Sequence, residues 1–230
     1  MLNDDMKSFI ALSLREDIGE GDVTSESSVP DSLVQKGYIL AKEVGVVAGI
    51  EVAREVFNQV DPQVKFNAIV SDGSNVKYGD VVIELEGPAR SILSGERLAL
   101  NFMQRMSGIA SRTNEIVKIL EGTPTRVLDT RKTTPGLRAF EKWSVQLGGG
   151  VNHRMGLYDM ILLKDNHVDY AGGMREALLK VSDYQKAREH RLPLVIETRS
   201  FEEIESALGA SEETGIEIDR IPNGIRPIPD

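Results

Sequence analysis

The fold is decided by residues 125–154, which read TRVLDTRKTTPGLRAFEKWSVQLGGGVNHR. The segment opens with a short apolar run, continues through a polar loop that contains Pro and Gly, and then carries apolar residues at helical spacing. The same order returns downstream in DMILLK (159–164) before MREALLKVSDYQKAREH (174–190), in LPLVIE (192–197) before FEEIESALG (201–209), and in a last apolar run, IEIDRI (216–221). This repetition of strand, loop and helix predicts an α/β barrel.

The N-terminal part of the chain has a different pattern. Apolar residues at helical spacing predict a helix over 5–15, and the turn-forming residues of 17–32 predict a long loop. Short β-rich runs lie between residues 36 and 85, and GIEVAREVFNQV (49–60) interrupts them with helical periodicity. We therefore expect an N-terminal α/β sandwich domain over residues 1–104.

A long helix is expected to link the two parts. Apolar residues recur at helical spacing from Glu96 to Leu120, Ser94 is a candidate N-cap, and Gly108 is a candidate break. The predicted fold class is α/β and α+β, with the sandwich followed by an open, incomplete α/β barrel over 105–221 and a Pro-rich tail over 222–230. The barrel is expected to be incomplete because only about four strand candidates follow Thr125, and prolines cannot donate strand hydrogen bonds.

Composition excludes several classes of protein. The chain has 230 residues, 36 acidic against 27 basic side chains, a formal charge of −9 and 5% aromatic residues, so a nucleic-acid partner is not expected. There is no cysteine, which removes disulfides, thiolate zinc sites and a catalytic thiol. No segment approaches the ~20 consecutive apolar residues that cross a bilayer, so no membrane association is expected and the cytoplasm is the expected location.

Five cationic or ionisable side chains concentrate on loops that flank the strand-like runs, despite the acidic balance of the chain. In a parallel α/β barrel the carboxyl ends of the strands converge on one face, so residues distant in sequence line a single cavity. The pattern predicts a pocket for an anion. The five residues are Arg131, Lys132, His153, Arg154 and Lys164.

Each of these residues also has a simpler interpretation. Arg131 and Lys132 are suited to an oxyanion beside the Thr133–Gly136 turn, or they form a solvated pair of charges. His153 and Arg154 follow three glycines that permit close backbone approach to a ligand, although a histidine is more often a hydrogen-bonded structural residue.

Lys164 and Glu197 each end a predicted strand. Lys164 is suited to phosphate, or it points outward and pairs with Asp165. Glu197 is suited to hold Mg²⁺ through water or to stabilise positive charge on a sugar, or it pairs with Arg199.

Three segments of the chain resemble the quinolinate phosphoribosyltransferase family, also called nicotinate-nucleotide pyrophosphorylase (carboxylating). They are REDIGEGDVTS (15–25), ERLALNFMQRMSGIAS (96–111) and VLDTRKTTPGLRAFEKWSVQLGGGVNHRMGLYDMILLKDNHV (127–168). The resemblance runs from about residue 5 to Ile221. It implies an N-terminal α/β sandwich, an open-sided α/β barrel, and a homodimer or higher homo-oligomer in which each active site borrows residues from the partner.

The resemblance also implies an enzyme of NAD biosynthesis. This phosphoribosyltransferase, of the glycosyltransferase class, converts quinolinate and phosphoribosyl pyrophosphate, bound with Mg²⁺, into nicotinate mononucleotide, pyrophosphate and carbon dioxide. Two anionic substrates arrive together, so cations must neutralise several negative charges.

Roles are implied residue by residue. Arg131, His153 and Arg154 look like binders of the quinolinate carboxylates, and Arg97 is similar to the arginine offered by the neighbouring subunit. Lys132 and Lys164 match lysines near the carboxylates and phosphates, and Glu197 matches an acid of the phosphoribosyl site. By this resemblance the candidate catalytic residues are Lys132, Lys164 and Glu197, and no residue is assigned as a resident metal ligand.

The chain departs from the family after Ile221, where PNGIRPIPD replaces the expected further βα units. Weak or no binding of phosphoribosyl pyrophosphate by this polypeptide alone is therefore expected. Two alternative functions stay open: an inactive, truncated family member that serves only as a dimerising or anion-binding domain, and a relative associated with molybdate transport that takes another substrate.

Overall fold

The computed structural model describes residues 2–221, and the chain divides into two compact units, Met1–His153 and Arg154–Asp230. The tail expected over 222–230 lies outside the described residues. The domain boundary expected at residue 104 lies within a helix, and that division stays a prediction. The two units are described separately.

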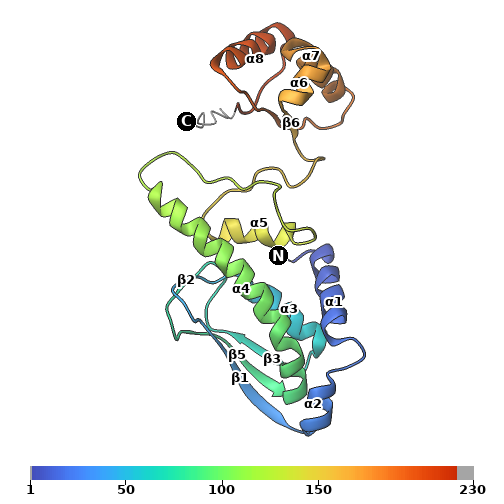
Figure 1. The fold of residues 1–230 in the computed structure, drawn as a ribbon, viewed down its shortest axis with the longest axis vertical. Coiled ribbons are helices and arrows are strands. Elements are labelled where there is room, and N and C mark those ends of the chain that lie inside the picture. Colours follow the sequence, from blue (N-terminus) through green and yellow to red (C-terminus); the bar gives the residue numbers. More distant parts are fainter. Residues whose placement is uncertain (1, 222–230) are drawn as a thin grey trace, which may run out of the picture. The chain divides into compact units, whose positions relative to one another are not determined.

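The first unit has a three-stranded antiparallel sheet in the order β1-β5-β3 and a second, two-stranded ladder, β2-β4 (Figure 1). Its strands are β1 (Val34–Leu40), β2 (Gly45–Val46), β3 (Lys65–Ala68), β4 (Asn75–Val76) and β5 (Val81–Pro88). Its helices are α1 (Asp4–Ile18), α2 (Val23–Ser28), α3 (Ile50–Val60), α4 (Ala89–Ile119) and α5 (Arg138–Leu147).

The core of this unit lies where α3 and α4 pack side by side and α4 contacts β1 and β5 (Figure 1). Phe57, Ile83 and Met106, from α3, β5 and α4, are each no more than 1% exposed and belong to one cluster of buried apolar side chains. Burial of large apolar side chains is the main stabilising contribution, at roughly 25 cal/mol per Å² removed from water. The predicted sandwich of sheet and helices is therefore present.

Two expectations for this unit were wrong. The loop predicted over 17–32 contains α2, whose N-cap Asp22 accepts a hydrogen bond from the Ser25 backbone N–H at 3.0 Å. Ser94 does not cap α4, which begins directly after β5 at Pro88; the Ser94 hydroxyl instead donates to Asp22 at 3.2 Å. The first expectation failed because α2 has only six residues, too few to show apolar periodicity in the sequence.

The break expected near Gly108 is also absent, because α4 is continuous from Ala89 to Ile119. On either side of the glycine, the Ser107 and Ser111 hydroxyls accept hydrogen bonds from the backbone N–H groups of Ala48 and Val46, each at 2.9 Å. These contacts attach α4 to residues 46–48, and they offset the modest cost of ~1 kcal/mol that a glycine adds inside a helix.

The second unit contains the parallel strands β6 (Ile161–Leu163) and β7 (Leu194–Ile196). Its helices are α6 (Asp165–Ala171), α7 (Met174–Lys186) and α8 (Phe201–Thr214). Leu178, Leu194 and Ile196 are fully buried in a separate apolar cluster that includes residues of α7, α8 and both strands. Strand, helix and parallel strand thus alternate here as predicted.

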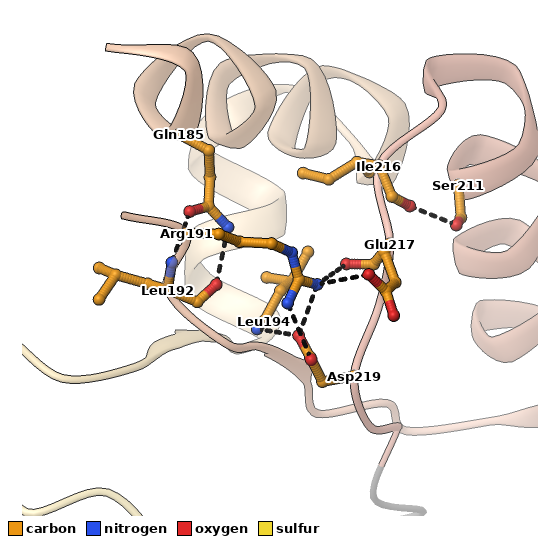
Figure 2. Close-up of polar contacts among 8 residues, drawn as sticks. All are labelled: Gln185, Arg191, Leu192, Leu194, Ser211, Ile216, Glu217 and Asp219. Carbon is orange, nitrogen blue, oxygen red and sulfur yellow. Dashed lines mark hydrogen bonds and ion pairs between the residues drawn. The ribbon is translucent and has the colours of Figure 1, made fainter. Parts of the chain in front are cut away.

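A network of polar contacts joins residues 191–194, which lead into β7, to residues 217–219 (Figure 2). Arg191 makes a two-pronged contact with Asp219, with Nη1–Oδ1 at 3.0 Å and Nη2–Oδ2 at 2.8 Å, and Asp219 also accepts from the backbone N–H of Leu194 at 2.6 Å. Val195 and Arg220 form a parallel bridge. The run IEIDRI therefore lies beside β7 as a single bridge, shorter than the predicted strand.

The first predicted barrel strand, TRVLD, is likewise reduced to one parallel bridge between Leu128 and Val151. Within residues 2–221 the parallel pairing comprises β6, β7 and these two bridges, and it forms no closed barrel. The mixed α/β class, with an N-terminal sheet unit, is confirmed.

Candidate functional site

Asp129 and Lys142 form a buried ion pair at the end of the Leu128 bridge. The side chains are 6% and 1% exposed, and Nζ of Lys142 contacts Oδ1 of Asp129. Lysine is almost never fully buried unless it is paired. The pair joins α5 to the first residue of the loop that continues to Arg131 and Lys132.

The same carboxylate holds the second cationic loop. Oδ1 of Asp129 accepts a hydrogen bond from the backbone N–H of His153 at 2.7 Å. The Asn152 amide, in the orientation that satisfies both of its polar atoms, donates to Oδ2 of Asp129 at 2.7 Å and to the Lys142 carbonyl at 2.8 Å. Asp129 therefore fixes the starting points of the loops that carry Arg131 and His153.

Arg131 is half-buried, and its Nε–H is fully buried with no hydrogen-bond partner among residues 2–221. A buried donor without an acceptor costs about 1–3 kcal/mol, so such groups are rare in folded proteins. Lys132 is exposed, and its backbone N–H donates to the Thr130 hydroxyl at 3.1 Å. The Nε–H group of Arg131 is therefore able to donate a hydrogen bond to a ligand.

The turn after Lys132 is clamped to α4 and α5. Glu141 accepts hydrogen bonds from Nε of Arg105 at 2.9 Å and from the backbone N–H of Thr134 at 3.2 Å. The Glu141 side chain is only 11% exposed, which strengthens these contacts relative to water.

Arg154, in the second unit, is buried, and its Nη1 lies 3.5 Å from the carbonyl oxygen of Met160. The turn around it is closed by Asp159, which accepts from the backbone N–H groups of Met155 at 2.6 Å and Gly156 at 2.9 Å. Burial of Asp159 favours its neutral form, yet these two backbone bonds and the charge of Arg154 together lower its pKa. The turn is therefore held by an ionised carboxylate.

Lys164 and Glu197 come together where β6 and β7 end. Nζ of Lys164 lies 2.8 Å from Oε2 of Glu197, and the two side chains are 43% and 46% exposed. Neither simpler pairing considered from the sequence is formed, because Lys164 contacts Glu197 and Arg199 contacts Glu203 at 2.6 Å. Parallel neighbouring strands bring these two residues side by side, as the pattern predicts.

Arg97 is exposed on α4 in the first unit, and so is its neighbour Glu96. Their exposure agrees both with a solvated helix face and with a residue that reaches another copy of the chain. Among residues 2–221, no three His, Asp or Glu side chains gather closely enough to hold a metal ion.

Lys142 was missed as a site residue by sequence reasoning. Its neighbours in α5, Glu141 and Ser144, are buried as well, which the sequence hides because a charged residue in a helix is usually exposed. The sequence carries no signal for its burial: that Phe140 and Ser144, two residues on either side of it, are also buried is seen only in the folded chain. Periodicity alone does not distinguish such a lysine from a solvated one.

Comparison with known proteins gives the family. A family model described as quinolinate phosphoribosyl transferase, N-terminal domain, matches residues 22–107, and the corresponding C-terminal domain model matches residues 109–224. The chain belongs to the quinolinate phosphoribosyltransferase family. The family assignment expected from the TRKTTPG, GGGVNHR and ILLKDNH motifs is thereby confirmed.

Several relatives are similar over most of this chain. Quinolinate phosphoribosyltransferase (decarboxylating) 1b of Nicotiana tabacum is 43% identical over 218 residues, which are 94% of this chain and 62% of the relative. A probable nicotinate-nucleotide pyrophosphorylase (carboxylating) of Bacillus subtilis is 43% identical over 195 residues, 85% of this chain and 66% of the relative.

Solved structures of the family share the fold. NadC from Streptococcus pyogenes superposes with a TM-score of 0.88 at 37% identity, covering 96% of this chain and 75% of that one. The chain thus spans a little under two thirds of the tobacco relative's length and three quarters of the Streptococcus structure. No helix within residues 2–221 is both long enough and apolar enough to span a membrane.

Proposed function

We propose that the chain catalyses phosphoribosyl transfer to quinolinate with decarboxylation. The reaction takes quinolinate and the Mg²⁺ complex of phosphoribosyl pyrophosphate, and it yields nicotinate mononucleotide, pyrophosphate and carbon dioxide. Family membership supports this proposal, and one structural observation carries it: the buried, unpartnered Nε–H of Arg131, on a loop whose base is fixed by Asp129. A guanidinium with an unused, desolvated donor is suited to a planar carboxylate.

The proposed roles follow the family motifs. Arg131, His153 and Arg154 bind the carboxylates of quinolinate. Lys132 neutralises negative charge on the same substrate. Arg97, exposed on α4, acts from a neighbouring copy in a homodimer or higher homo-oligomer. The assembly and the cytoplasmic location are parts of the proposal.

Lys164 and Glu197 are proposed to act on the phosphoribosyl substrate. Their 2.8 Å ion pair is half-exposed, so Lys164 exchanges its contact with Glu197 for a phosphate at little cost. Glu197 is then released to face positive charge on the ribose ring. The divalent ion enters as part of the substrate, because a polyphosphate brings most of the oxygen ligands that Mg²⁺ needs.

The chemistry proceeds in two steps. The ring nitrogen of quinolinate forms a bond to the anomeric carbon while the bond to pyrophosphate breaks, through an oxocarbenium-like state that Glu197 stabilises electrostatically. The nitrogen becomes positively charged, and this charge stabilises the carbanion left when the adjacent carboxylate departs as carbon dioxide. That carbanion then takes up a proton, so no further electron acceptor is required.

The test is a direct assay of nicotinate mononucleotide with the full chain, Mg²⁺ and phosphoribosyl pyrophosphate. At phosphoribosyl pyrophosphate concentrations high enough to offset the weak binding expected from the C-terminal sequence, we expect product from quinolinate and none from nicotinate. Product from nicotinate alone would select the alternative of a relative that takes another substrate. Binding of quinolinate without any product would select the alternative of an anion-binding domain.

A further inference from the structure

Lys142 is buried deeply for a charged residue, and Asp129 is its one carboxylate partner within residues 2–221. Its side chain is 1% exposed on α5, and Nζ contacts Asp129, which is 6% exposed. A buried ion pair is weak evidence for stability, because apolar residues of similar volume often fill the same space at no loss. The pair therefore calls for another explanation.

The contacts of Asp129 use both of its oxygens. Oδ1 accepts from Lys142 and from the backbone N–H of His153, and Oδ2 accepts from Asn152. A carboxylate offers about four lone-pair positions, so three donors, one of them cationic, leave little capacity for a further partner.

Arg131 follows Asp129 by two residues, and its Nε–H is buried without a hydrogen-bond partner in the described chain. Arginine and a carboxylate form the strongest common side-chain pair, with two parallel hydrogen bonds. An unneutralised carboxylate so close along the chain would attract the Arg131 guanidinium. In the structure, Asp129 pairs with Lys142 instead.

We propose that Lys142 is a positioning residue: by occupying Asp129 it keeps the Arg131 guanidinium unpaired and available to a carboxylate-bearing ligand. The identity of that ligand as quinolinate rests on the proposed function, whereas the competition between Lys142 and Arg131 for Asp129 does not. Lys142 itself touches no substrate in this proposal.

The first test is spectroscopic and needs no ligand. The Nε–Hε resonance of Arg131 is assigned by its loss in Arg131→Lys. It is then compared in three forms of the 230-residue chain: the wild type, Lys142→Met, and the double variant that combines Lys142→Met with Asp129→Asn. We expect the resonance to move downfield in Lys142→Met, as Arg131 pairs with the vacated carboxylate, and to return toward the wild-type position in the double variant. An unchanged resonance in folded Lys142→Met would overturn the proposal.

Lys142→Gln provides a second route where Lys142→Met does not fold. Glutamine keeps one N–H donor but no charge, so the same downfield shift of smaller size is expected. A purely structural role for Lys142 predicts lowered thermal stability in both single variants with no specific movement of the Arg131 resonance.

The second test is calorimetric titration with quinolinate. Lys142→Met is expected to bind about tenfold more weakly than wild type, the change for one lost charge-assisted hydrogen bond, and the double variant is expected to recover part of that loss. Equal loss in the single and double variants would reject the positioning role. A wild type that does not bind quinolinate would reject the proposed function, and the resonance of Arg131 would still decide the inference about Lys142.

Discussion

Two groups of charged residues in the candidate site differ in burial. Asp129 and Lys142 are buried and shape the loops, whereas Lys164 and Glu197 are half-exposed and remain accessible. Half-exposed ion pairs contribute about 0–1 kcal/mol to stability, because water screens the charges and ordering the side chains costs entropy. Function rather than stability therefore explains the second group best.

Replacing Arg131 with alanine is expected to weaken quinolinate binding by roughly 10- to 100-fold, since a charged hydrogen-bond partner in a desolvated position contributes ~1.5–3 kcal/mol. Calorimetric titration measures the change. Arg126→Ala, which removes an exposed arginine five residues earlier, is the matched control and should bind as wild type does. Equal affinities of wild type and Arg131→Ala would reject the carboxylate-binding role.

Glu197→Gln separates stability from activity at the end of β7. Because the Lys164–Glu197 pair is about half exposed, we expect its loss to change the free energy of unfolding by less than ~1 kcal/mol, while product formation falls sharply. Thermal unfolding and the product assay are measured on the same sample. Glu205→Gln, on exposed α8 surface, is the control, and activity retained by Glu197→Gln would remove Glu197 from the mechanism.

At the scale of elements, the contact between α4 and α5 depends on a close backbone approach. A Cβ added at Gly148, which caps the end of α5, would lie 2.3 Å from the carbonyl oxygen of Ala110 in α4. Both sides of this contact are backbone or Cβ, so a larger residue must push the helices apart.

Gly148→Ala is therefore expected to lower the free energy of unfolding by ~1–3 kcal/mol. Gly108→Ala, where an added Cβ meets nothing within 4 Å, should raise it by ~0.5–1 kcal/mol because alanine favours the helix. Urea denaturation followed by circular dichroism compares the two. A Gly148→Ala variant as stable as Gly108→Ala would show that α5 does not approach α4 this closely.

The contact between Arg191 and Asp219 makes the stability of the second unit depend on pH. The hydrogen bond from Arg191, opposed by partial burial and helped by the Leu194 backbone N–H, lowers the pKa of Asp219 below its ordinary value of 3.8. The folded state therefore favours the ionised form. Its stabilising contribution is complete above the unfolded pKa and is lost as the pH falls through the folded pKa.

Asp219→Asn should accordingly cost roughly 1 kcal/mol at pH 7, a value reduced because the side chain is about a third exposed, and the difference from wild type should shrink below about pH 4. Urea midpoints across this range measure it. Asp183→Asn, at an exposed pair with Lys186, is the control. A difference that grows toward low pH would contradict the sign of the shift.

Elements with strong periodicity were predictable, and isolated pairings were not. The helix expected over 174–190 is α7 at Met174–Lys186, and the apolar runs ILL and LVI are β6 and β7. The run TRVLD became a single bridge at Leu128, because pairing depends on a neighbouring segment and not on the run itself.

At the scale of the whole molecule, the sequence motifs predicted the family but not how the site is organised. The cations were recognisable from their loops, whereas Lys142 acts through a contact with Asp129, 13 residues away, that only the folded chain reveals. Tertiary contacts of this kind produce no periodic pattern in the sequence. Lys142 lies within the family motif of residues 127–168, but nothing in the motif shows that it contacts Asp129.

The most direct test of the central claim, that these cations recognise a dicarboxylate, is calorimetric titration of the full chain with quinolinate and with nicotinate under identical conditions. Quinolinate carries one more carboxylate, so it is expected to bind at least about tenfold more tightly, the change for one charge-assisted hydrogen bond. Equal affinity for the two compounds, or binding of neither, would contradict the account.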